Sequence, residues 1–132
     1  MIRTSRMGKT GLNAVLKTEL APEMKESIQQ QLQNYDELEQ DAVKLAEGRG
    51  WKMKNTNPVL AHMIEHMTRM KLGKKDRNSK IARMVIEGNT QGVISSFHDL
   101  HRYEGEDHKV VALNRKFIEC EKNHIRQMEK FL

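Results

Sequence analysis

The chain has 132 residues, a formal net charge of +5 and a hydrophobic fraction of 37%. That length predicts one domain, residues 1–132, with a core of its own. The single cysteine, Cys120, excludes an internal disulfide, and no apolar run is long enough for a signal core or a membrane span. We therefore expect a cytoplasmic protein without a membrane-spanning segment.

Residues with high helix propensity fill every long segment, whereas strand-type alternation of apolar and polar residues does not occur over any useful window. The sequence predicts an all-α fold. Residues 4–19 form a short helical segment with an untidy apolar pattern. We expect residues 1–21 to form an N-terminal arm or lid.

A long helix is predicted to begin at Pro22, a good first helical residue, with Glu23 complementing the positive end of the helix dipole. It should end at Gly48–Gly50, where a glycine can take a left-handed conformation. Its apolar residues recur at steps of three or four and predict a core-facing stripe: Met24, Ile28, Leu32, Tyr35, Leu38, Ala42 and Leu45.

A third helix is predicted from Pro58, capped by Thr56 or Asn57, to near Gly73. Its stripe is Leu60, Met63, Ile64, Met67 and Met70. Residues 71–80 are strongly basic, but no aromatic residues accompany the charges, so a solvated loop is expected and a nucleic-acid contact is not.

A fourth helix, capped by Asn78 or Ser79, should run to Gly105. Small residues recur along one edge of this helix at four-residue spacing: Gly88, Gly92 and Ser96. Because glycine inside a helix costs about 1 kcal/mol relative to alanine, these residues need a reason to be there. A close-packing notch for a neighbouring backbone is the favoured reason, and a groove for a substrate is the alternative.

Asp107 is predicted to begin the last helix. Together the four long helices predict an antiparallel four-helix core, residues 22–132, joined by short loops.

Most histidines fall on polar helix faces at 100° per residue. These are His62 and His66 on the third helix and His98 and His101 on the fourth, while His108 belongs to a turn. The last helix differs, because Glu121 and His124 fall among its apolar residues, and Asn114 also points inward.

A carboxylate inside a bundle costs several kcal/mol unless it is paired, hydrogen-bonded or bound to metal. One hypothesis is a buried polar layer of Tyr35, Asn114, Glu121 and His124 that fixes the helix register. The other is a metal site for Fe, Mn or Zn with Glu39, Glu121 and His124 as ligands.

The Glu121-x-x-His124 motif in a helical bundle resembles the ferritin-like superfamily over about residues 22–132. The resemblance implies a four-helix bundle, and Glu39 would stand at a lone-Glu ligand position. No second Glu-x-x-His occurs in the chain. The chain is therefore most similar to small bacterial members that lack a complete di-iron site.

No catalytic residues are predicted, since no Ser/His/Asp set and no phosphate-binding glycine loop is present. We expect a non-enzymatic bundle without a cofactor that acts by self-association as a homodimer, or by binding a partner helix on a Met-rich or Gly88/Gly92 surface. The alternative function is metal binding at an incomplete or intersubunit site.

Overall fold

The computed structural model describes residues 2–18, 20–50, 77–103, 105 and 107–132. Within these ranges it contains four α-helices and no strand: α1 (Ile2–Leu16), α2 (Pro22–Gly48), α4 (Arg77–Arg102) and α5 (His108–Glu129). The helix predicted around residues 58–73, with His62 and His66, lies outside the described residues, as does most of the basic stretch 71–80.

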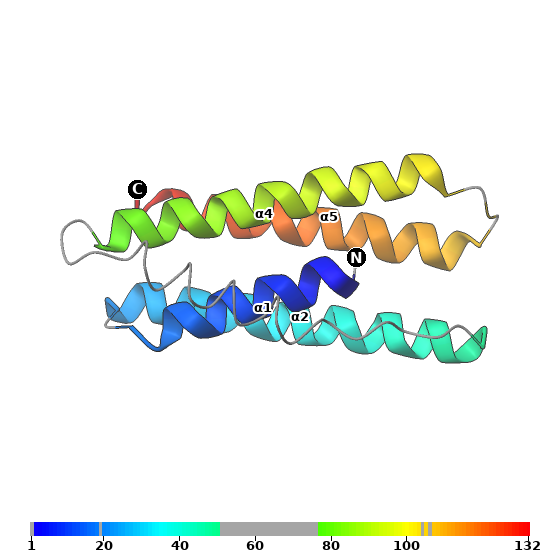
Figure 1. The fold of residues 1–132 in the computed structure, drawn as a ribbon, viewed down its shortest axis with the longest axis horizontal. Helices are drawn as coiled ribbons and strands as arrows, with labels where there is room; N and C mark the ends of the chain where they lie inside the picture. Colours follow the sequence, from blue (N-terminus) through cyan, green and yellow to red (C-terminus); the bar gives the residue numbers. More distant parts are fainter. Residues whose placement is uncertain (1, 19, 51–76, 104, 106) are drawn as a thin grey trace.

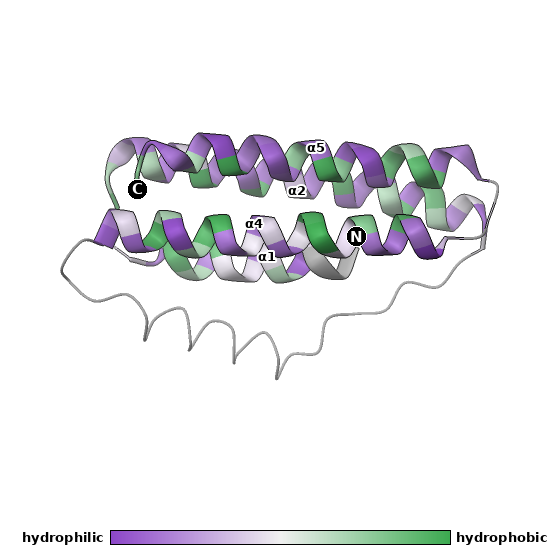
Figure 2. Ribbon diagram, turned by 90° about the horizontal axis from the view of Figure 1, so that it is seen from above, coloured by the Kyte–Doolittle hydropathy of each residue, from purple (hydrophilic) through white to green (hydrophobic). Residues whose placement is uncertain are grey.

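The four helices form an all-α bundle in which each helix packs mainly against two of the others. Helix α1 lies beside α2, and α4 lies beside α5 (Figure 1). In the view turned by 90°, α1 and α4 share one layer and α2 and α5 share the other (Figure 2). The α2–α5 and α1–α4 contacts close the arrangement. Side chains that point to the bundle axis from different helices can therefore meet.

The ends of α2 and α5 follow the predicted cap chemistry. Ala21 is extended (φ −60°, ψ 142°) and Pro22 follows it in the first turn of α2. Past the other end of α2, Gly50 has φ 69°, the left-handed conformation that favours glycine. The carboxylate of Asp107 accepts a hydrogen bond from the Lys109 backbone N–H at 3.0 Å, which caps α5.

The start of α4 differs from the prediction. Asn78 and Ser79 lie within the helix, which already includes Arg77, so neither residue is its N-cap. Ile81 and Ala82 are fully buried in the core. Packing of these two residues favours helix in the preceding turn, where the local preference of Asn and Ser for cap positions would have stopped it.

The core draws on all four helices, and α1 takes a full part in it. Its buried apolar members are Leu12, Val15, Met24, Ile28, Tyr35, Leu38, Ile81, Ala82, Val85, Phe117 and Met128. Leu12 and Val15 belong to α1, which packs against both α2 and α4. The N-terminal segment, predicted as an arm beside the bundle, is thus one of the helices of the described bundle. Its apolar stripe is short and interrupted by glycines, which hid this role in the sequence.

A buried polar cluster as the candidate functional site

Five side chains from three helices form a hydrogen-bonded group that we call the polar cluster: Asn34, Tyr35, Asn89, Glu121 and His124. Tyr35 comes from α2, Asn89 from α4 and Glu121 from α5. Glu121 is 1% exposed and His124 is fully buried. The cluster therefore lies within the apolar core, where unpaired polar groups are costly.

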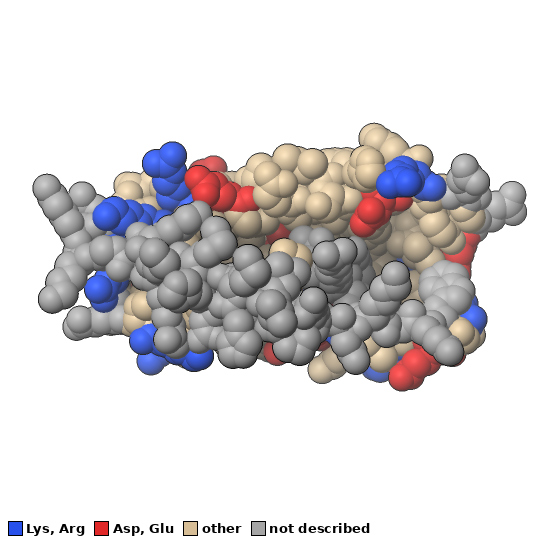
Figure 3. Space-filling model, viewed as in Figure 1, with Lys and Arg blue, Asp and Glu red and all other residues tan. Residues whose placement is uncertain are grey.

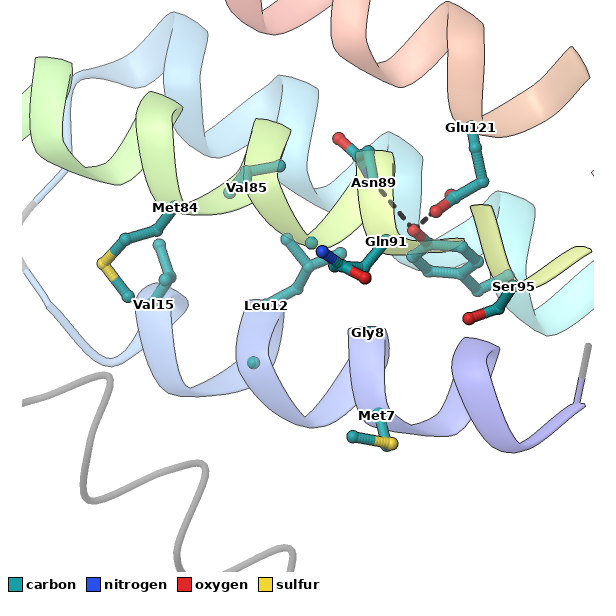
Figure 4. A pocket seen from close by; sticks show the side chains of 13 residues that line it. Met7, Gly8, Leu12, Val15, Met84, Val85, Asn89, Gln91, Ser95 and Glu121 are labelled. Atoms are coloured by element: carbon teal, nitrogen blue, oxygen red, sulfur yellow. Dashed lines mark hydrogen bonds between the residues drawn. The ribbon is translucent and has the colours of Figure 1, made fainter. Parts of the chain in front are cut away.

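Tyr35 is the centre of the cluster. Its hydroxyl donates a hydrogen bond to Glu121 Oε1 and accepts one from Asn89 Nδ2 at 3.1 Å (Figure 4). The ring lies edge-on to the His124 ring, with centroids 5.2 Å apart, and 6.2 Å from the Phe117 ring. On its far side the ring lies against Gly8 of α1, where a Cβ atom would come within 3.2 Å of it. Tyr35, which belongs to α2, thus touches each of the other three described helices.

The hydrogen bonds around His124 define its tautomer. Gln30 Nε2 donates to Asn34 Oδ1 at 3.1 Å, which turns the Asn34 amide nitrogen toward His124 Nε2 at 3.0 Å. An amide N–H facing Nε2 makes that nitrogen an acceptor, so the neutral ring carries its proton on Nδ1. Nδ1 lies 3.2 Å from Glu121 Oε1 and donates to it. Glu121 therefore accepts from two side chains, Tyr35 and His124.

Burial and the neighbouring carboxylate shift two pKa values in the same direction. Burial, followed by the charge and hydrogen bond of Glu121, raises the pKa of Tyr35 far above its usual value. Burial and the charge of Glu121 raise the pKa of the Cys120 thiol to about 11. Cys120 Sγ lies 3.4 Å from His124 Nε2, yet its thiol is protonated at neutral pH. Neither group is poised as a nucleophile.

Asn114, predicted to belong to the layer, lies elsewhere in the core. Its Nδ2 donates to the backbone carbonyl of Ser96 at 3.1 Å, which links α5 to α4. Some buried polar atoms have no hydrogen-bond partner among the described residues: both amide atoms of Gln31, Asn89 Oδ1, Ser96 Oγ and Asn114 Oδ1. Asn34 is a member of the polar cluster that the sequence did not predict. Its neighbour Tyr35 marks the inward face of α2, and Asn34 beside it is only half-buried.

The side chain of Glu39 is bonded to residues of α1 and is not brought together with Glu121. Lys9 Nζ contacts Glu39 Oε2 at 2.6 Å and Asp36 Oδ1 at 2.8 Å, and Ser5 Oγ donates to Glu39 Oε1 at 3.4 Å. Burial alone would lower the pKa of Lys9, but these two acidic partners raise it. Among the described residues, no group of three or more His, Cys, Asp or Glu side chains is placed to hold a metal ion. The predicted ligand set Glu39, Glu121 and His124 is therefore not brought together.

The three small residues of α4 have different surroundings. Gly88 is exposed, and a Cβ atom built on it meets no described atom within 4 Å. Gly92 and Ser96 are buried. Gly88 borders a pocket of about 520 Å³ between α1 and α4, whose floor includes Tyr35 and Glu121. Gly11 on the α1 side also has no described atom within 4 Å of its Cβ position.

Comparison with family models, with curated proteins and with solved structures found no match to this chain. In the described part of the chain, no helix has the length and apolar character needed to cross a membrane. What can be said of function therefore depends on the geometry itself.

Proposed function

We propose that the chain is a non-enzymatic, antiparallel ferritin-like bundle that acts by association, as a homodimer formed through the outer surface of α4. The observation that carries this proposal is an uncharged stretch of α4 with exposed apolar side chains. Between Glu87 and Asp99 the helix contains no Asp, Glu, Lys or Arg. Depletion of charge, with large apolar residues present, distinguishes the centre of a protein interface from other surface.

Ile94 and Phe97 stand in this uncharged stretch, one helical turn apart. Ile94 is 55% exposed and Phe97 is 40% exposed. Figure 3 shows the uncharged surface over the middle of α4, with acidic and basic side chains on either side of it. A single exposed apolar residue needs no explanation, but two neighbours in an uncharged stretch favour a contact surface.

The surroundings of Phe97 supply a polar edge for such a contact. Lys122 Nζ of α5 lies 5.6 Å from the centroid of the Phe97 ring, and the His101 ring centroid lies 6.5 Å from it. An aromatic anchor bordered by polar groups is the usual arrangement of an interface centre and its rim. A two-fold axis across α4 would place this surface against its own copy. A partner helix is the other occupant that the same surface could take.

Within this proposal the polar cluster has a structural role. Its hydrogen bonds link α2, α4 and α5 at one level of the bundle. A shift of one helix along its neighbour would break several of these bonds at once, so the cluster favours a single register.

The test is the mass of the protein in solution, measured by sedimentation or light scattering at micromolar concentration. We expect a dimer for the wild type and a monomer for both Ile94→Glu and Phe97→Glu, because each places a charge in the centre of the contact. Helix content and melting temperature should stay close to the wild type, since both side chains are exposed. Gln40→Glu, an exposed substitution on α2, is the matched control and should remain a dimer.

A wild-type monomer, or dimers that survive both α4 substitutions, would contradict the homodimer. A wild-type monomer that binds an added amphipathic helix, and loses it in Phe97→Glu, would assign the surface to a partner helix.

A further inference from the structure

The pocket between α1 and α4 borders the stretch of α4 proposed for association, but Ile94 and Phe97 do not line it. Its volume of about 520 Å³ lies within the range of pockets that hold small molecules, about 300–1,000 Å³. Figure 4 shows Leu12 reaching into the pocket from α1 and Glu121 reaching in from α5. Residues of α1 and α4 form its walls, and Tyr35, Asn89 and Glu121 of the polar cluster also line it.

The walls are mostly apolar and can adapt in shape, with Gln91 and Ser95 as polar residues on the α4 side. Met7, Leu12 and Val15 line the α1 side, and Met84 and Val85 line the α4 side. Methionine side chains adapt to ligands of different shape because they are unbranched and polarisable. The open Cβ positions of Gly11 and Gly88 keep space free on both walls. An aliphatic body fits this lining better than a polar one.

The charge of the lining selects the polar end of the ligand. Glu121 is the single charged side chain among the described residues that line the pocket. The nearby cation Lys9 is already bonded to Asp36 and Glu39. A carboxylate has about four acceptor positions, and the two hydrogen bonds from Tyr35 and His124 leave capacity for a further donor. A buried carboxylate gains most from a donor that is also a cation.

We propose that this pocket binds a small amphipathic molecule with an aliphatic body and a primary ammonium head, which donates hydrogen bonds to the Glu121 carboxylate. An anionic head of the same size would meet the Glu121 charge, and none of the described lining residues is basic. A neutral hydroxyl head would gain a hydrogen bond without the charge attraction. The order of affinity is therefore ammonium, then alcohol, then carboxylate.

The experiment uses the full chain and three probes of one chain length, hexylamine, hexanol and hexanoate, with binding measured by calorimetry and by amide chemical shifts. We expect hexylamine to bind about tenfold more tightly than hexanol, because a charged donor is worth more than a neutral one. Hexanoate should show the weakest binding. The shifted amides should belong to α1 and α4 around Gly11 and Gly88.

Two variants test separately the charge of Glu121 and the free volume of the pocket. Glu121→Gln keeps the side-chain shape and should reduce the preference for hexylamine over hexanol to near zero. Gly88→Leu places a side chain in the pocket and should abolish binding of both probes. Gly48→Leu is the matched control, since Gly48 also has an open Cβ position but lies at the far end of α2, and it should bind as the wild type does.

Three results would overturn the proposal: equal affinity for hexylamine and hexanoate, unchanged binding in Gly88→Leu, or no binding of any probe at millimolar concentration. If Glu121→Gln fails to fold, the proposal is still tested by Gly88→Leu and by the relative affinities of the three probes. The comparison of the three probes does not require a dimer, because neither Ile94 nor Phe97 lines the pocket.

Discussion

Glu121 accepts hydrogen bonds from Tyr35 and His124, and it is only 1% exposed. We predict that Glu121→Gln costs less than about 1 kcal/mol of unfolding free energy, because the amide oxygen still accepts from both donors. Glu121→Ala leaves both donors unmatched, and we expect it to cost roughly 1 to 3 kcal/mol. Urea unfolding followed by circular dichroism measures both values.

Glu119→Ala is the control for this pair, since Glu119 is exposed on the same helix and should change stability by no more than about 0.5 kcal/mol. If Glu121→Ala is as stable as the wild type, the polar cluster does not contribute to the fold.

The raised pKa of Tyr35 makes a separate prediction at alkaline pH. A phenol whose pKa is higher in the folded than in the unfolded chain binds its proton more tightly when folded. Its contribution to stability is complete below the unfolded pKa of about 10 and is lost as the pH rises above that value. In a Tyr103→Phe variant, where Tyr35 is the only tyrosine, tyrosinate absorbance should therefore appear together with the loss of helix signal. Ionisation at pH 10 in an intact bundle would contradict the burial of this hydroxyl.

At the scale of the helix, alanine substitutions at two glycines of α1 distinguish the effect of packing on stability from the effect of helix propensity. Alanine is better than glycine in a helix by about 1 kcal/mol, so Gly11→Ala, which meets open space, should stabilise the protein by about 0.5 to 1 kcal/mol. Gly8→Ala should destabilise it, because the new methyl group would press on the Tyr35 ring at 3.2 Å. The ring cannot move freely, since Glu121 and Asn89 hold its hydroxyl.

Thermal melts of the two alanine variants measure this difference between neighbouring turns of one helix. Equal stabilisation in both would show that Gly8 of α1 does not pack against the Tyr35 ring.

The same helix shows where prediction from sequence reaches its limit. Helices α2 and α5 were predictable because their apolar stripes are long and Pro22 and Asp107 mark their starts. Helix α1 was harder, because its contact with α2 depends on a residue without a side chain, Gly8, and on the Lys9 ion pairs. An apolar pattern records neither of these features.

The polar cluster, too, could be predicted only in part from the sequence. Helical periodicity identifies the faces of Tyr35, Glu121 and His124, but it gives no relative height for side chains on different helices. The positions of the side chains along the bundle axis decide that Tyr35 meets Glu121 and that Asn114 instead contacts Ser96. They also place Asn34 beside His124, a contact between residues 90 positions apart.

At the scale of the whole molecule, the hydrogen bonds between helices and a metal site would make opposite demands on the same side chains. The donors and acceptors that would bind Fe, Mn or Zn are engaged with one another in the described bundle. His124 Nε2 accepts from Asn34, Glu121 accepts from Tyr35, and Glu39 is bonded to Lys9. A metal ion would have to displace these partners and draw Glu39 away from α1.

We therefore predict that freshly purified protein contains no stoichiometric Fe, Mn or Zn, and that adding these ions leaves the melting temperature unchanged. Elemental analysis and melts with and without a chelator measure this, with mass in solution recorded on the same samples. The prediction would be contradicted by metal bound at one ion per chain or per dimer. Such metal should be lost in His124→Ala and retained in His98→Ala if the cluster is a metal site. In that case the hydrogen bonds of the cluster would describe an apo arrangement, and a second subunit would be the natural source of the ligands that one chain does not bring together.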